Sequence, residues 1–221
     1  MIKSEYNKYT NMASSKLDVL EKLFGSAAKV KMMRLFLFNP EKAFENKDIS
    51  KRAKISANLV RSETKKLEHI KLIKNRVFMK DTPKKPGRRS SAKKKVKGWS
   101  LNRSFPYIGP LQSFLTQTSL LRHDDIIKNL SKTAKIKLII ISGVFIQDSD
   151  NRVDILVVGD NMKPYRLERA IRSMEAEIGK EIRYAAFETT DFKYRLGMYD
   201  KLIRDILDYP HEKVLNKLGV D

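Results

Sequence analysis

The chain has 221 residues, 41% of them hydrophobic, and its lack of cysteine excludes disulfide scaffolds, thiolate zinc sites and cysteine nucleophiles. Its net charge of +20 is concentrated in residues 1–110, which hold 28 Lys and Arg against 9 Asp and Glu, whereas residues 111–221 hold 18 against 17. The uneven charge indicates two domains. Because the positive charges of the first half repel one another, this half is expected to bind a polyanionic partner, most commonly a phosphate backbone.

The sequence carries no signal for a metal, a membrane or export. His69, His123 and His211 are scattered without a partner at metal-ligand spacing, so we expect no metal and no cofactor. Residues 1–15 are polar, lack the apolar run of a signal peptide and are expected to form a flexible N-terminus. No segment approaches the length needed to span a bilayer. We therefore expect a cytoplasmic, nucleoid-associated protein without a membrane partner.

Residues 16–104 predict a set of helices followed by a β-hairpin. Apolar residues at helical spacing predict one helix that ends near Gly25 and another from Ser26 to Asn39. Asn46 is expected to cap a short helix, and Ser56 a longer one. Strands are expected at residues 72–79 and 96–101, with an irregular basic tip between them. The buried stripe of the helix after Ser56 is expected to comprise Val60, Thr64, Leu67 and Ile70.

The helix that follows Ser56 turns a polar and basic face outward. Amide and guanidinium groups read base edges, and ammonium and hydroxyl groups bind phosphates, so this face suits the major groove of double-stranded DNA. The hairpin tip would place cations along the neighbouring backbone or minor groove. The candidate DNA-binding residues are Ser56, Asn58, Arg61, Ser62, Lys65 and Lys66 on the helix, and Lys84, Lys85, Arg88, Arg89, Lys93, Lys94 and Lys95 on the tip. The alternative is that the charge only solvates an ordinary helical bundle.

A family resemblance rests on the stretch FGSAAKVKMMRLFLFNPEKAFENKDISKRAKISANLVRSETKKLEHIKLIKN. It resembles the winged helix-turn-helix domains of prokaryotic transcription regulators, over about residues 20–110. Within it, SANLVRSETKKLEHIKLI is similar to the family's recognition helix running into the first strand of the wing. The resemblance implies a DNA-binding regulator, although the wing here is longer and more basic than is usual.

Residues 105–134 are expected to form a connector helix, running from Leu111 to about Leu130. Such a helix could pack between the domains or pair with its copy, and it is the candidate interface of a homodimer that would read two half-sites. Trp99, at the end of the hairpin, is expected to pack against apolar neighbours rather than to stack on a base.

Residues 135–221 predict a second α+β domain. Buried strands are expected at 136–143 and 153–160, followed by a helix at 164–178, a strand at 181–187, a helix at 191–207 and a short element near Val214. The order of strands and helices favours a sheet with helices over it.

The stretch ISGVFIQDSDNRVDILVVGD resembles the nucleotidyltransferase domain of the DNA polymerase β superfamily, over roughly residues 135–218. That family holds nucleotide phosphate with a Gly-Ser pair and Mg²⁺ with two Asp residues spaced i, i+2. Gly143 and Asp154 match, but Val144 stands in place of the Ser and Arg152 in place of the first Asp. The strand EIRYAAF offers no third carboxylate in its interior. Gly143, Arg152 and Asp154 are therefore a vestigial nucleotide site, in which we expect Arg152 to pair with Asp154 or to bind a nucleotide or another anion.

The sequence thus predicts an α+β fold with an N-terminal winged helix-turn-helix domain, a connector helix and a C-terminal nucleotidyltransferase-like α/β domain without catalytic residues. We expect a transcription regulator that binds double-stranded DNA, with the C-terminal pseudoenzyme as scaffold or sensor. Two alternatives stay open: an active nucleotidyltransferase that modifies protein or RNA, and a non-specific architectural protein of the chromosome.

Overall fold

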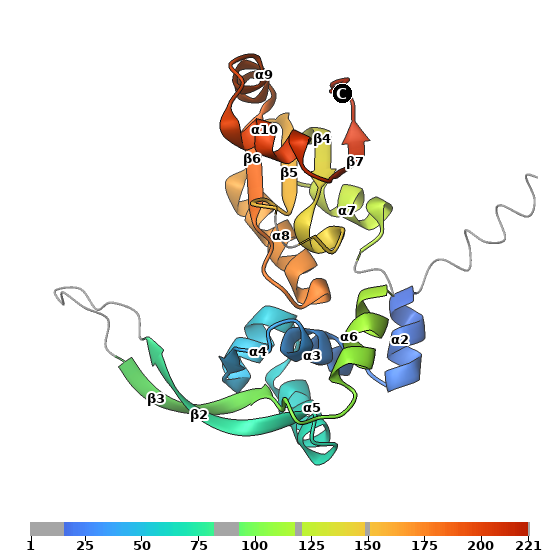
Figure 1. Ribbon diagram of the computed structural model, residues 1–221, viewed down its shortest axis with the longest axis vertical. Helices are drawn as coiled ribbons and strands as arrows, with labels where there is room; N and C mark the ends of the chain where they lie inside the picture. Colours follow the sequence, from blue (N-terminus) through green and yellow to red (C-terminus); the bar gives the residue numbers. More distant parts are fainter. Residues whose placement is uncertain (1–15, 82–92, 118–120, 149–150, 221) are drawn as a thin grey trace, which may run out of the picture. The chain divides into compact units, whose positions relative to one another are not determined.

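The computed structural model describes residues 16–81, 93–117, 121–148 and 151–220, and the chain divides into two compact units (Figure 1). Unit 1 comprises residues 1–119 with 178–180, and unit 2 comprises residues 120–177 with 181–221. The fold is mixed α+β, with one small sheet in each unit. Across the described ranges, no helix is both long enough and apolar enough to cross a membrane.

Unit 1 contains the helices α2 (Lys16–Phe24), α3 (Ala27–Leu37), α4 (Asn46–Ala53), α5 (Ala57–His69) and α6 (Ile108–Gln117). The hydroxyls of Ser26 and Ser56 cap α3 and α5, accepting the N–H groups of Lys29 and Leu59, and of these two caps the one by Ser56 was predicted. The cap of α4 was predicted one residue too late. Its N-cap is Glu45, which forms a reciprocal capping box with Asp48, because a carboxylate three residues on can bond back to the cap N–H.

The sheet of unit 1 has the order β1-β3-β2 and is antiparallel throughout. Its strands are β1 (Ala43–Phe44), β2 (Ile73–Asp81) and β3 (Lys93–Leu101), and in Figure 1 the β2–β3 hairpin extends beyond α4 and α5 as a twisted ribbon. Pairing continues to Asp81 and Lys93, so the hairpin is longer than predicted. Gly98 allows β1 to approach β3, since a Cβ there would collide with the Phe44 carbonyl.

The core of unit 1 confirms three positions of the predicted stripe, because Val60, Thr64 and Leu67 are buried. Ile70 was predicted to be buried as well, but it is 51% exposed, because α5 ends at His69 and Ile70 is its C-cap. The buried residues of the cluster include Val30, Met32, Leu35, Phe36, Phe44, Ile49, Val60, Leu67, Leu72, Ile73, Leu101 and Leu115. Trp99 is half-buried and packs against this cluster, as predicted.

Unit 2 is built on a four-stranded sheet with the order β6-β5-β4-β7. The strands are β4 (Lys135–Ile141), β5 (Ile155–Asp160), β6 (Tyr184–Glu188) and β7 (Glu212–Asn216). Only β5 and β6 are parallel, and α8 (Pro164–Ile178) makes the crossover between them. The other helices are α7 (His123–Leu130), the short 3₁₀ helix η2 (Gly143–Phe145), α9 (Thr189–Gly197) and α10 (Lys201–Asp208).

Two of the predicted helices are each a pair of helices. The connector expected from Leu111 to Leu130 consists of α6, which belongs to unit 1, and α7, which belongs to unit 2. Leu115 of α6 is buried in the unit 1 core and Leu111 packs against it, so this chain covers part of the stripe that was the candidate dimer interface, whereas Phe114 is 38% exposed. The helix expected at 191–207 is interrupted around Tyr199, whose backbone is left-handed with φ at 53°.

Candidate nucleic-acid interface

The helix α5 presents the polar face that its sequence predicts. Asn58, Arg61, Ser62, Lys65 and Lys66 are all exposed, as is the capping residue Ser56. The opposite side of α5 is held in the core of unit 1 by apolar packing, and the buried Thr64 hydroxyl is satisfied within the helix, where it donates to the Val60 carbonyl at 2.8 Å. Three residues separate α4 from α5, and Lys54 closes α4 in the left-handed conformation.

Ion pairs divide the cations of α5 into two kinds. Lys66 Nζ lies 2.8 Å from Glu63 Oε1, and Lys29 Nζ lies 4.0 Å from the other oxygen of that carboxylate, which is only 3% exposed. Lys66 therefore neutralises a buried charge of its own chain. In the part of the chain that the structure describes, Arg61 and Lys65 have no such partner, so their full charge faces solvent.

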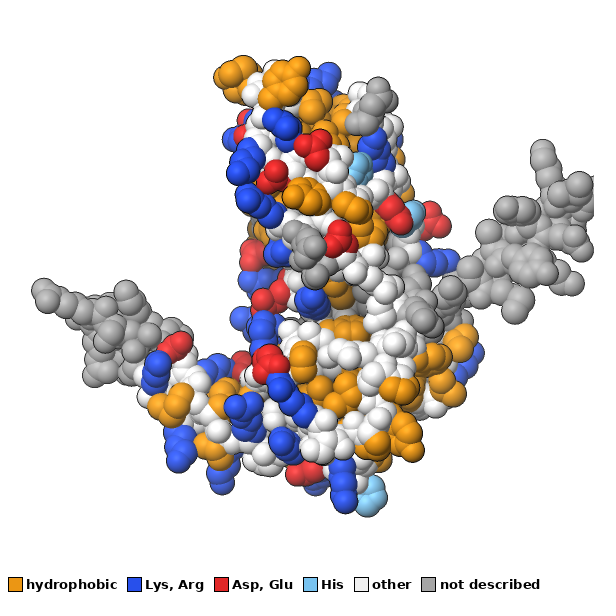
Figure 2. All heavy atoms as spheres, viewed as in Figure 1, with side chains coloured by type: hydrophobic (Ala, Val, Ile, Leu, Met, Phe, Trp, Pro, Cys, Tyr) orange, Lys and Arg blue, Asp and Glu red, His pale blue; other side chains and the backbone are white. Residues whose placement is uncertain are grey.

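Lysines also line the hairpin. Lys93, Lys94 and Lys95 were predicted to lie on an irregular tip, but they belong to β3, where they are exposed. Residues that alternate along a strand share a face, which places Lys93, Lys95 and Lys97 together. None of these three has an acidic partner within the described ranges, and Figure 2 shows basic side chains gathered along the described part of the hairpin. The remaining predicted tip residues, Lys84, Lys85, Arg88 and Arg89, lie outside the described residues.

One hairpin cation has a structural role. Lys80 lies on β2 opposite Lys94, and its Nζ contacts Asp48 Oδ1 at 2.7 Å and Glu45 Oε1 at 3.6 Å. Both carboxylates belong to the capping box of α4. The contact ties the hairpin to α4 and offsets the repulsion between the two facing lysines.

In unit 2 the structure brings Gly143 and Asp154 together. Gly143 has a left-handed φ of 54°, and a Cβ at this position would collide with the Asp154 carboxylate. Asp154 lies just before β5, not within a strand as predicted. Arg152 does not join them, since its guanidinium pairs with Asp205 at 3.3 Å.

The buried carboxylate of Asp154 is saturated by four N–H donors. The Arg183 side chain donates from Nε at 3.0 Å and from Nη2 at 2.9 Å, and the backbone N–H groups of Arg183 and Val144 donate at 2.7 and 2.9 Å. Burial alone would raise the pKa of Asp154, but the hydrogen bonds from Arg183 and Val144 outweigh burial and lower that pKa. The predicted pair of Asp154 with Arg152 is wrong, and Arg183 is the partner.

This donor set does not fit a magnesium ion. Mg²⁺ takes oxygen ligands, whereas both oxygens of Asp154 accept N–H groups, and the side chain at the expected serine position is Val144. Asp148 and Asp150, in the turn before β5, are the nearest carboxylates that precede Asp154 in the sequence, but Asp148 accepts from Asn151 at 2.9 Å, and Asp150 lies outside the described residues. Within the described ranges, no group of three acidic, histidine or cysteine side chains is placed to hold a metal.

Comparisons with known proteins give no match for this chain among family models, curated proteins or solved structures. The geometry and charge of the two units are therefore the basis for inferring a function.

Proposed function

We propose that the chain is a transcription regulator that binds double-stranded DNA through a winged helix-turn-helix domain in unit 1. The observation that carries the proposal is the exposed face of α5, where Asn58, Arg61 and Lys65 have no side-chain partner among the described residues, beside a hairpin whose Lys93, Lys95 and Lys97 form no ion pair within the same ranges. Further support comes from the element order α3-β1-α4-α5-β2-β3, the sheet order β1-β3-β2 and the short turn before α5, which are what a winged helix requires.

In this proposal α5 enters the major groove. Arg61 and Asn58 have the donor patterns that suit guanine and adenine edges, while Ser56, Ser62 and Lys65 contact phosphates. The β2–β3 hairpin is the wing and places Lys93, Lys95 and Lys97 against the backbone beside the groove. The protein acts as a homodimer on two half-sites, through a surface other than α6, which is already packed in unit 1.

Unit 2 is, in the same proposal, a nucleotidyltransferase-like domain that has lost its chemistry. Support comes from Asp154, whose carboxylate stabilises the loop at Gly143 and binds Arg183 in place of a metal. The domain then serves as a scaffold, or as a sensor that takes up a nucleotide or another anion.

The test is selection of duplexes from a random library with the full chain, followed by affinity measurements on the selected and on random sequences. Arg61→Ala should cost ~1–3 kcal/mol on the selected site and less on random duplex. Lys193→Ala, an exposed lysine of α9 in unit 2, is the matched control and should change neither affinity. Equal losses of affinity on the selected and on the random duplex would mean that Arg61 does not contact base edges. A library that yields no preferred sequence would favour the architectural alternative, and labelled nucleotide incorporated by the parent chain would favour the enzyme.

A further inference from the structure

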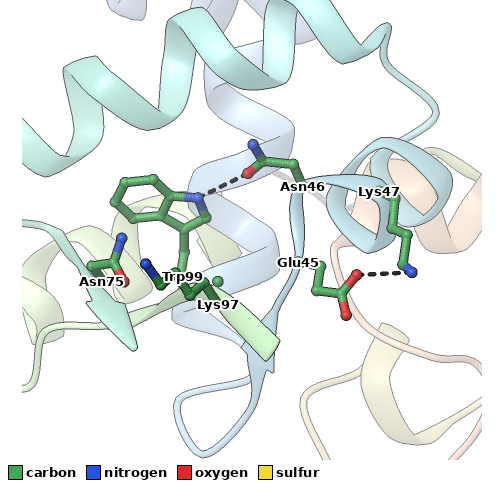
Figure 3. Close-up of a pocket in the computed structure, with 7 residues that line it drawn as sticks. Glu45, Asn46, Lys47, Asn75, Lys97 and Trp99 are labelled. Atoms are coloured by element: carbon green, nitrogen blue, oxygen red, sulfur yellow. Dashed lines mark hydrogen bonds and ion pairs between the residues drawn. The ribbon is translucent and has the colours of Figure 1, made fainter. Parts of the chain in front are cut away.

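The base of the hairpin carries an open pocket (Figure 3), and Lys97 is the one lining residue that the proposed duplex contacts also use. Its volume is about 370 Å³, near the small end of the range for ligand sites in proteins. Its walls come from the start of α4, from β2 and from β3, all within unit 1. The lining residues are Glu45, Asn46, Lys47, Asn75, Lys97, Gly98 and Trp99.

The indole of Trp99 forms a fixed wall of this pocket. Its N–H donates to Asn46 Oδ1 at 2.8 Å, as the dashed line in Figure 3 marks, and its backbone pairs with Phe44 and Asn75 on either side. Because its only donor is already satisfied, the indole offers a ligand its π surface and nothing else. A flat, rigid aromatic surface at a pocket wall suits a planar partner that stacks.

The polar groups around the indole suit a nucleobase. Asn75 is exposed, and its carboxamide has no partner within the described ranges. Its NH2 group can donate one hydrogen bond to a base edge while its carbonyl oxygen accepts another. Lys97 is equally unpaired, and Lys95 and Lys93 continue along the same face of β3. Lys47 pairs with Glu45 at 3.0 Å at the start of α4. The row of lysines can follow the phosphates on one side of a stacked base.

We propose that this pocket binds an unpaired nucleobase of single-stranded DNA, with the base stacked on Trp99, its edge on Asn75 and its flanking phosphates on Lys97 and Lys95. A base inside a duplex has both faces covered, so only an unpaired or extruded base can occupy such a site. The inference rests on the proposed function, in that duplex binding by α5 brings DNA to the hairpin. It shares Lys95 and Lys97 with the proposed wing contacts, but it adds Trp99 and Asn75 and concerns a different state of the DNA.

Two asparagines of unit 1 give a matched pair of variants for the test. Asn75 and Asn58 are both exposed and without a hydrogen-bond partner among the described residues, so alanine at either position should leave the fold intact. Asn75→Ala should weaken binding of a short single-stranded DNA oligonucleotide and leave duplex binding unchanged. Asn58→Ala should do the reverse. Trp99→Leu should weaken single-strand binding about tenfold, the usual size of one base–aromatic stack, with unchanged duplex affinity as its folding control.

Because Trp99 is the only tryptophan, the parent chain reports directly on the pocket. Its fluorescence should be quenched by the single-stranded oligonucleotide, and neither a fully paired duplex nor free AMP at the same nucleotide concentration should quench it. Quenching by AMP as strong as by the oligonucleotide would overturn the strand assignment in favour of a small effector. Duplex binding without single-strand quenching would overturn this inference alone, whereas loss of specific duplex binding with quenching retained would overturn the proposed function alone.

Discussion

Replacing Arg183 by methionine should destabilise unit 2 much more than replacing Arg152, although Arg152 is the nearer of the two to Asp154 in sequence. The Arg183 side chain makes two hydrogen bonds to a carboxylate that is only 3% exposed. Removing one partner of a buried pair costs ~3–5 kcal/mol. Arg183 is itself 51% exposed, and two backbone N–H groups stay on Asp154, so we expect about 2–3 kcal/mol after this discount.

Arg152 provides the matched control. Its guanidinium is 66% exposed and makes a single contact with Asp205 at 3.3 Å. Exposed pairs of this kind contribute ~0–1 kcal/mol, so Arg152→Met should leave stability nearly unchanged.

Urea unfolding of the full chain, followed by two probes, can measure the difference. Far-UV circular dichroism reports both units, whereas the fluorescence of Trp99 reports unit 1. For Arg183→Met the transition of unit 2 should move down by about 1–2 M urea, and the fluorescence transition should not move. An equal shift for the Arg152 variant would refute the reasoning.

Three further outcomes are expected. Lys65→Gln should weaken duplex binding while leaving stability unchanged, whereas Lys66→Gln should lower the unfolding temperature, because the buried Glu63 carboxylate then keeps only the 4.0 Å contact with Lys29. Similar effects of both on stability would contradict the division of the α5 cations. Replacing Lys93, Lys95 and Lys97 together by Gln should reduce the slope of log K against log salt for duplex by about 2–3, and an unchanged slope would mean that the wing does not reach phosphate. The pKa of Asp154 is lowered in the folded protein, so its contribution to stability is complete above the unfolded value of ~3.9 and is lost as the pH falls through the folded pKa. Arg183→Met should therefore move acid unfolding of unit 2, followed by circular dichroism, to higher pH, and an unmoved midpoint would contradict this.

Local signals explain what the sequence predicts well. Ser26 and Ser56 are typical N-caps placed just before apolar stripes, so the starts of α3 and α5 and the exposed face of α5 can be predicted. β1 is too short to show a strand pattern, since it has only two residues. The break at Tyr199 does carry local signals, since Gly197 ends α9 and Asp200 caps α10, but the apolar spacing continues across both helices and the prediction of one helix followed that spacing.

Tertiary pairing explains what the sequence does not predict. Asp154 and Arg183 are 29 residues apart, and only the parallel pairing of β5 with β6 brings them together. Arg152 has the right charge and is two residues away, but the chain turns its guanidinium to Asp205 on α10. Glu63 is a second example. Its place in the sequence is typical of a solvated helix face, but in the structure it is buried and α3 brings Lys29 close to it. Charge and spacing identify candidates, and packing selects among them.

Asp154 also explains why changing the two departures from the nucleotidyltransferase pattern is not enough to create a metal site. Val144→Ser with Arg152→Asp adds a hydroxyl and a carboxylate, but Asp154 would still accept four N–H groups. Mg²⁺ needs near-octahedral oxygen ligands and gives up its water reluctantly, so it would first have to displace Arg183. That displacement would incur the cost of about 2–3 kcal/mol expected for removing Arg183 from the pair. Metal binding and folding would therefore compete for one carboxylate, and a magnesium site at Asp154 would require the loss of Arg183 together with another source of stability.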